Sequence, residues 1–157
     1  MGMGNGSPID SEAIDESVER MRKQLDNAVF NVQFQYQKEQ PFKQRSGSDH
    51  RAARVTVTPG VHKRGGYFDI QWWENGDYKY HYREEGVEFR FGREAANENT
   101  NNPVQHFHPP HDLNAHKQSC IGVEEPPELV TIAVLKTWWA AVKNSDESLV
   151  NAQNGLP

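Results

Sequence analysis

The chain has 157 residues, of which 35% are hydrophobic, so it is long enough to bury one core and predicts a single domain. The formal net charge of −5 argues against a protein that coats nucleic acid indiscriminately, although it permits a local basic face. Cys120 is the only cysteine, which excludes an internal disulfide and the usual cysteine patterns of zinc sites. No apolar run approaches membrane-spanning length and the N-terminus lacks signal-peptide features, so we expect a cytoplasmic protein that does not enter a membrane.

Residues 1–8 are rich in glycine and are expected to form a disordered leader. A single α+β domain is expected over 9–144, followed by a flexible tail over 145–157. Helical spacing of Ile14, Val18, Met21 and Leu25 predicts a first helix. Asp10 or Ser11 is its expected cap, and it should end near residues 26–27.

Alternation of apolar and polar residues then predicts an antiparallel sheet of about five strands. The strands are expected near residues 28–37, 52–58, 67–73, 78–83 and 87–91. The segment 38–50 is expected to be a loop, and over the wider range 38–64 basic residues outnumber acidic ones. Such a loop is either solvated surface or a guide for a nucleic-acid backbone.

The hairpin at Glu85-Gly86 tests the register of the sheet. A two-residue turn there sets Tyr82 opposite Phe89 and Tyr80 opposite Phe91, so that aromatic residues meet aromatic residues. It also sets His81 opposite Arg90 and Arg83 opposite Glu88. The sheet should therefore have one aromatic face and one polar face.

The preceding hairpin is less regular. A three-residue, bulged loop over 75–77 pairs Trp72 with Tyr80 and Ile70 with Tyr82, and keeps apolar residues on one face. Trp73 is then left on the polar face, where an exposed ring could stack on a nucleobase. The alternative is that Trp73 packs beneath the neighbouring loop.

The expected polar face carries Lys79, His81, Arg83, Glu88 and Arg90. An imidazole that titrates near neutral pH beside several cations suits phosphate chemistry. The alternative is the solvated side of a half-buried antiparallel sheet.

A long segment over 92–120 is expected to be a loop without regular structure, and it contains His106, His108, His111 and His116. Some of these imidazoles could join His81 as acid and base. A metal could instead use His106, His108 and His111, although the spacing does not match structural zinc patterns. The third possibility is an ordinary surface loop.

Pro126-Pro127 predicts the start of a last helix. Its expected apolar stripe is Leu129, Ile132, Leu135, Trp139 and Val142, which should pack on the aromatic face of the sheet.

Three segments together resemble the TumE family of toxin–antitoxin toxins: YKYHYREEGVEFRF, HFHPPHDLNAHK and GVEEPPELVTIAVLKTWW. The resemblance implies a ribonuclease fold of the RelE-like or barnase–EndoU-like kind. At the positions that match the family's functional residues, this chain has His81, Arg90, His108, His116 and Lys117. The chain departs from the usual family pattern at Gly92-Arg93, where Asp-Asn is common, and at Gln118, where a histidine is common.

The leading hypothesis is a metal-independent endoribonuclease toxin that acts on single-stranded RNA, needs no cofactor and has a small antitoxin partner. His81 or His108 would be the base and His116 the acid. RNA and its phosphates would contact Arg54, Lys79, Arg83, Arg90, Lys117 and Trp73. The alternatives are a non-enzymatic module that binds protein or RNA, and a zinc-binding protein built on the histidine loop.

Overall fold

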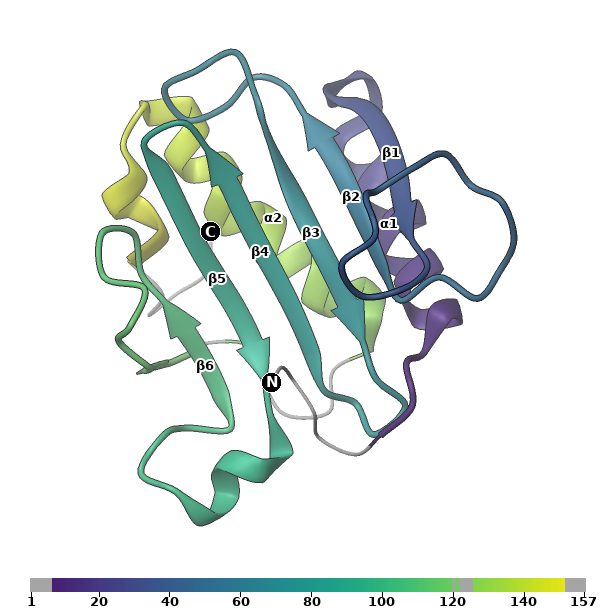
Figure 1. The fold of residues 1–157 in the computed structure, drawn as a ribbon. Coiled ribbons are helices and arrows are strands. Elements are labelled where there is room, and N and C mark those ends of the chain that lie inside the picture. The colour runs from purple at the N-terminus through teal and green to yellow at the C-terminus, as the bar shows by residue number, and fades with distance from the viewer. Residues whose placement is uncertain (1–6, 120, 122–125, 152–157) are drawn as a thin grey trace.

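Two helices cover one face of a seven-stranded antiparallel sheet in the computed structural model, which describes residues 7–119, 121 and 126–151 (Figure 1). The strands are neighbours in chain order: β1 (Val29–Gln35), β2 (Ala52–Val57), β3 (Gly66–Trp72), β4 (Tyr78–Glu84), β5 (Val87–Arg93), β6 (Gln105–His108) and β7 (Lys117–Gln118). The helices are α1 (Ser11–Leu25) and α2 (Pro127–Asn144). The predicted α+β architecture is confirmed, with seven strands in place of about five.

The two additional strands come from the segment that was expected to be an irregular loop. β5 continues to Arg93, and β6 then pairs antiparallel with it, so that Phe107 lies opposite Phe91. Phe107 is buried against the aromatic core, and this burial stabilises β6. The histidines and the glutamine of this strand do not themselves predict a strand. His106 and His108 therefore stand on a strand of the sheet.

The ends of both helices agree with the sequence. The Asp10 carboxylate accepts a hydrogen bond from the Ala13 N–H at 3.0 Å, which caps α1. α1 ends at Leu25, and a short 3-10 helix, Asp26–Ala28, leads into β1. Pro127 is the first residue of α2, as predicted.

The predicted apolar stripe of α2 is confirmed in part: Leu135 and Val142 are buried in the core, but Leu129 and Trp139 are not. Leu129 and Trp139 are 49% and 39% exposed, whereas Val134 and Trp138 are fully buried. Trp138 packs against Phe68 and Tyr82, with ring centroids 5.8 and 6.0 Å away. α2 carries apolar residues on both sides, so the helical period alone could not show which side meets the sheet.

The register at Glu85-Gly86 is confirmed for every predicted pair between β4 and β5. The register between β3 and β4 is wrong by two residues, because Trp72 lies opposite Tyr78 and Ile70 opposite Tyr80. The connection spans 73–77, and the Trp73 N–H donates to the Asp77 carbonyl at 2.9 Å. A shift of two preserves the faces, so the aromatic residues still share one side.

Trp73 is 5% exposed and forms an isolated bridge with Ile9. Its ring is therefore not the exposed stacking platform that a nucleobase would need. The chain segment before α1 covers this end of the sheet, where the Pro8 carbonyl accepts from the Glu74 N–H at 2.9 Å.

Tyr80 joins the sheet to both helices. Its hydroxyl contacts the Ser17 hydroxyl of α1 at 2.7 Å and the Thr131 hydroxyl of α2 at 2.6 Å, and the Trp72 indole donates to it at 3.0 Å. Burial raises the pKa of Tyr80 to about 12, so the group stays a neutral phenol. These bonds fix both helices on the aromatic face and leave the polar face uncovered by them.

Residues 147–151 form a 3-10 helix whose Val150 is fully buried, although a flexible tail was expected from residue 145. Of the expected leader, residues 1–6 lie outside the described residues, as do residues 152–157 of the expected tail. None of the helices among the described residues is long and apolar enough to cross a bilayer.

Candidate active site on the polar face

One row of opposed residues crosses the polar face from β2 to β6. The row is Arg54, Asp69, His81, Arg90 and His108, each directly opposite the next across the ladder. Opposed residues in an antiparallel sheet project to the same side, so each of the five strands contributes one side chain of this row to the polar face.

Arg54 and Asp69 neutralise each other at the β2 end of the row. Their bonds from Nε and Nη2 measure 2.8 and 2.9 Å, a bidentate pair that raises the pKa of Arg54. The Arg54 guanidinium also lies over the rings of Phe42 and Tyr67. It is thus part of the sheet surface and stands apart from the histidines.

His81, Arg83 and Glu88 form a second closed group. Glu88 Oε2 lies 2.6 Å from His81 Nε2 and 3.0 Å from Arg83 Nε. Burial lowers the pKa of His81 to about 4, with the neighbouring arginines adding to the effect and Glu88 opposing it. At neutral pH the ring is therefore uncharged and donates its Nε2–H to the carboxylate, so this nitrogen is not free to accept a proton.

Three imidazoles converge at the β6 end of the face. His106 and His108 lie on β6 and His116 precedes β7, with ring centroids 5.0 Å apart for His106 and His108, 4.4 Å for His108 and His116, and 5.7 Å for His106 and His116. They line a cavity of about 160 Å³. The other lining residues are Tyr78, Lys79, Arg90, Gly92 and Glu94.

The backbone fixes the tautomers of two of these rings. His108 Nδ1 lies 2.7 Å from the Leu113 carbonyl and His106 Nδ1 lies 3.1 Å from the Val104 carbonyl. A carbonyl oxygen only accepts, so each Nδ1 carries the proton and each Nε2 keeps its lone pair. Burial, and next the charge of Arg90, lower the pKa of His108 to about 4, and burial lowers that of His106.

Arg90 and Lys79 are the cations of this cavity. Neither has a hydrogen bond or an ion pair with any residue that the structure describes, although both are partly buried. Burial lowers the pKa of each, because desolvation disfavours the charged form. Glu94 also lines the cavity but forms no ion pair with either cation, and a partly buried cation without an ion-pair partner favours an anion from solution.

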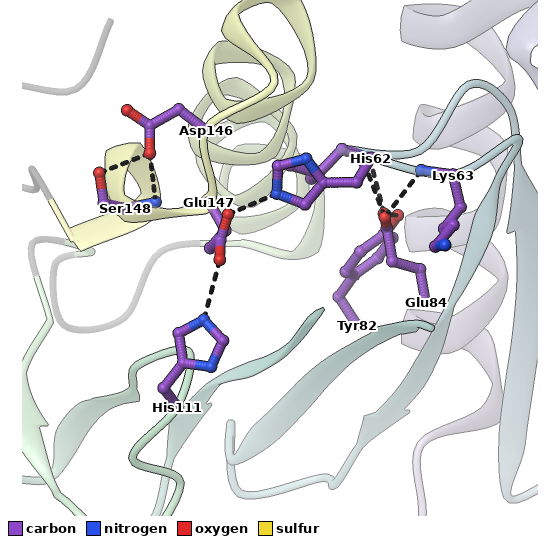
Figure 2. A network of polar contacts seen from close by, with 9 residues as sticks. His62, Lys63, Tyr82, Glu84, His111, Asp146, Glu147 and Ser148 are labelled. Carbon is purple, nitrogen blue, oxygen red and sulfur yellow. Dashed lines mark hydrogen bonds and ion pairs between the residues drawn. The ribbon is translucent and has the colours of Figure 1, made fainter. Parts of the chain in front are cut away.

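His111 and Lys117 do not join the cavity. The Glu147 carboxylate lies 2.8 Å from His111 Nε2 and 2.5 Å from His62 Nε2, so it bridges the histidine loop to the loop before β3 (Figure 2). These hydrogen bonds lower the pKa of Glu147 to about 2. Lys117 lies opposite Phe107, whose side chain belongs to the aromatic face, so its register directs it away from the histidines.

The histidines that the sequence offered as a possible metal set, His106, His108 and His111, do not come together, because His111 contacts Glu147. Among the described residues no group of three His, Cys, Asp or Glu side chains is arranged to hold a metal ion.

Sequence reasoning missed two supports of the site. Gly92 lies opposite His106, and a Cβ there would stand 2.7 Å from His106 Nε2. A glycine inside a strand, which often marks a close approach, was the available signal. The second support is Glu84, which accepts from the N–H groups of Val61, His62 and Lys63 and from the Tyr82 hydroxyl, and so holds the loop that carries His62 (Figure 2).

A family model described as Toxin TumE matches residues 16–145, a range that contains the whole sheet, the row across it and the three imidazoles. Comparison with curated proteins and with solved structures gave no significant match.

Proposed function

The chain belongs to the Toxin TumE family, and we propose that it is the endoribonuclease toxin of a toxin–antitoxin system, cleaving single-stranded RNA at the cavity of His106, His108 and His116. One observation carries the proposal. Arg90 and Lys79 are partly buried cations without a described carboxylate partner, beside an imidazole with a free lone pair. A phosphodiester would supply the missing negative charge.

The proposed step needs a base, an acid and cations. His108 Nε2 takes the proton from the RNA 2′-hydroxyl, whose oxygen attacks the adjacent phosphorus. The bond from phosphorus to the 5′-oxygen breaks, and His116 donates a proton to that leaving oxygen. The products are a 2′,3′-cyclic phosphate and a new 5′-hydroxyl, so atoms and charges balance without a cofactor.

His108 is favoured over His81 as the base because of their partners. His108 uses Nδ1 to bind Leu113 and keeps Nε2 free at the cavity, whereas His81 commits Nε2 to Glu88. His116 suits the acid role because it is exposed, so it can regain a proton from water, and its ring is 4.4 Å from that of His108.

Arg90 and Lys79 would stabilise the charge that develops on the phosphorane. Arg90 is a neighbour of His108 in the ladder and therefore stands beside the proton acceptor. Lys79 approaches from the adjacent row of the same face, opposite Gly92. Cations that are already fixed in a partly dehydrated cavity are more effective than cations in water.

The direct test uses purified, untagged protein and a short single-stranded RNA of mixed sequence, with and without EDTA. We expect cleavage that resists EDTA, products that carry 2′,3′-cyclic phosphate, and a loss of about 10² to 10⁴ in rate for His108→Ala. Binding of RNA without cleavage would instead support a non-enzymatic binding module. Stoichiometric zinc in the protein, with activity or folding lost in EDTA, would support the zinc-binding alternative.

A further inference from the structure

α2 carries a second apolar stripe that the sheet does not cover. Its sheet side holds Val134 and Trp138, which are fully buried. On this second side, intervals of three and four residues separate Leu129, Ile132, Lys136, Trp139 and Lys143, and Ala140 lies beside Trp139. Leu129 and Trp139 are the exposed large hydrophobic residues of the described chain. A helix that is apolar on two sides is typical of one that is covered on both.

All members of this stripe except Leu129 line a groove between the two helices, which we call the α1–α2 groove. The groove has a volume of about 470 Å³ and is closed on the other side by Gln24, Leu25 and Ala28 at the end of α1. Its floor is apolar, with Ile132, Leu135 and Trp139.

The charges at the rim have one sign. Lys136 and Lys143 line the groove, both are exposed, and neither has an ion pair with a described residue. The described lining contains no acidic residue. The rim is therefore basic on a chain whose formal net charge is −5, and it is complementary to an acidic partner.

We infer that the α1–α2 groove is the docking surface for the antitoxin, through an amphipathic segment whose apolar side chains fill the groove and whose acidic side chains pair with Lys136 and Lys143. The inference rests on the toxin role in the proposed function, but not on its ribonuclease chemistry. Apolar anchors give such a contact its affinity, and the charged rim gives it specificity and a faster association.

A second copy of the chain fits this groove less well. A symmetric dimer through the groove would bring Lys136 and Lys143 against the same two lysines, because both partners in such a contact use the same patch. Like charges facing each other disfavour that pairing.

Both helices lie on one side of the sheet (Figure 1), against the aromatic face. The register places His106 and His108 on the polar face, so the groove and the candidate site lie on opposite faces of the sheet. A segment docked in the groove leaves the cavity of His108 uncovered. The complex should therefore still bind a nucleotide at the cavity.

The test takes the protein product of the adjacent gene as the candidate antitoxin, purifies it separately and measures its binding to full-length variants of this chain by calorimetry. Trp139→Ala should weaken binding by about 30-fold, as truncation of an aromatic anchor does. Lys136→Glu with Lys143→Glu should weaken it by about tenfold or more, with a smaller salt dependence than the wild type. The matched charge reversal at Lys38 and Lys43, both exposed in the connection between β1 and β2 and neither of them in the lining of the groove, should leave the affinity unchanged.

Thermal unfolding of each variant controls for misfolding, and His108→Ala should bind the antitoxin like the wild type. If the groove variants bind with wild-type affinity, or the wild type does not bind, the inference is overturned whatever the RNA assay gives. If Trp139→Ala instead converts a wild-type dimer to a monomer without changing antitoxin binding, the groove belongs to a second copy. Groove-dependent binding by a toxin that cleaves no RNA would sustain this inference and reject the ribonuclease.

Discussion

Arg90 lies directly opposite His108 in the ladder between β5 and β6, so that a cation without a described carboxylate partner stands beside an imidazole whose pKa is lowered to about 4. The two side chains support one another's proposed roles. Burial, with the charge of Arg90 adding to it, keeps His108 neutral and able to accept a proton, while the same guanidinium can bind the phosphate that His108 would act on.

The variant Arg90→Ala tests whether Arg90 serves RNA cleavage or the stability of the fold. We expect RNA cleavage to fall by about 10² to 10³, because a fixed donor to the phosphate is lost. The free energy of unfolding should stay equal or rise, because a partly buried charge without a protein partner is removed. Parallel cleavage assays and urea unfolding curves measure both, with the exposed Arg64→Ala as the matched control. A loss of stability together with activity would contradict the assignment.

The lowered histidine pKa values predict how stability depends on pH. His81 and His108 have pKa values of about 4 in the folded protein, against about 6.5 in an unfolded chain. Between these values the unfolded state binds more protons than the folded state. The contribution of the two neutral histidines to the free energy of unfolding should therefore be at its maximum above pH 6.5 and should decrease as the pH falls toward 4. Urea unfolding at a series of pH values tests this. The slope in this window should decrease in the double variant His81→Gln with His108→Gln, and an unchanged slope would refute the lowered values.

Gly92→Ala tests the close approach of β5 to His106. The new Cβ would lie 2.7 Å from His106 Nε2, so the ring must turn away from the cavity. We expect a loss of about 1 to 3 kcal/mol in the free energy of unfolding from the overpacked site, together with lower RNA cleavage. The control is Gly92→Ala combined with His106→Ala, which removes the clashing ring and should recover stability. A stable, fully active Gly92→Ala variant would show that the position of His106 is unimportant.

Glu147→Gln should loosen the histidine loop without unfolding the sheet. It weakens the contacts to His62 and His111, for which we expect a loss of about 1 kcal/mol that diminishes at high salt. Amide hydrogen exchange should accelerate over residues 109–116 and around His62, while β4 and β5 stay protected. Glu98→Gln, on the exposed connection between β5 and β6, is the control. Equal exchange in both variants would mean that Glu147 does not hold the loop.

Much of the fold was accessible from the sequence because its central strands alternate strictly. The pairs between β4 and β5 follow from matching aromatic with aromatic residues around Glu85-Gly86. The β3–β4 pairing did not follow, since the hydrogen bond from the Trp73 N–H to the Asp77 carbonyl places the turn at residues 74–76, one residue before the predicted loop, and alternation does not encode this position. β6 was missed because Phe107 alone among its four residues signals a core position.

The site was predicted in its residue types more than in its grouping. Lys79, Arg90, His108 and His116 do line one cavity, which the polar face and the histidine loop both indicated. The sequence did not show that Glu88 holds both His81 and Arg83 outside the lining of the cavity. Alternation pairs Arg83 with Glu88 but does not indicate that His81 contacts the same carboxylate. His111 was considered only as a possible metal ligand, and its contact with Glu147 was missed because Glu147 lies in a segment that was expected to be flexible.

The row from Arg54 to His108 restricts where the chain can tolerate insertions and deletions. Each of its five members sits on a different strand, so a single-codon deletion within β3, β4 or β5 would turn part of that strand to the wrong face and break the row at one link. The long connections between β1 and β2 and between β5 and β6 carry no member of the row. Insertions should therefore accumulate there among descendants that keep the chemistry, while the lengths of the central strands stay fixed.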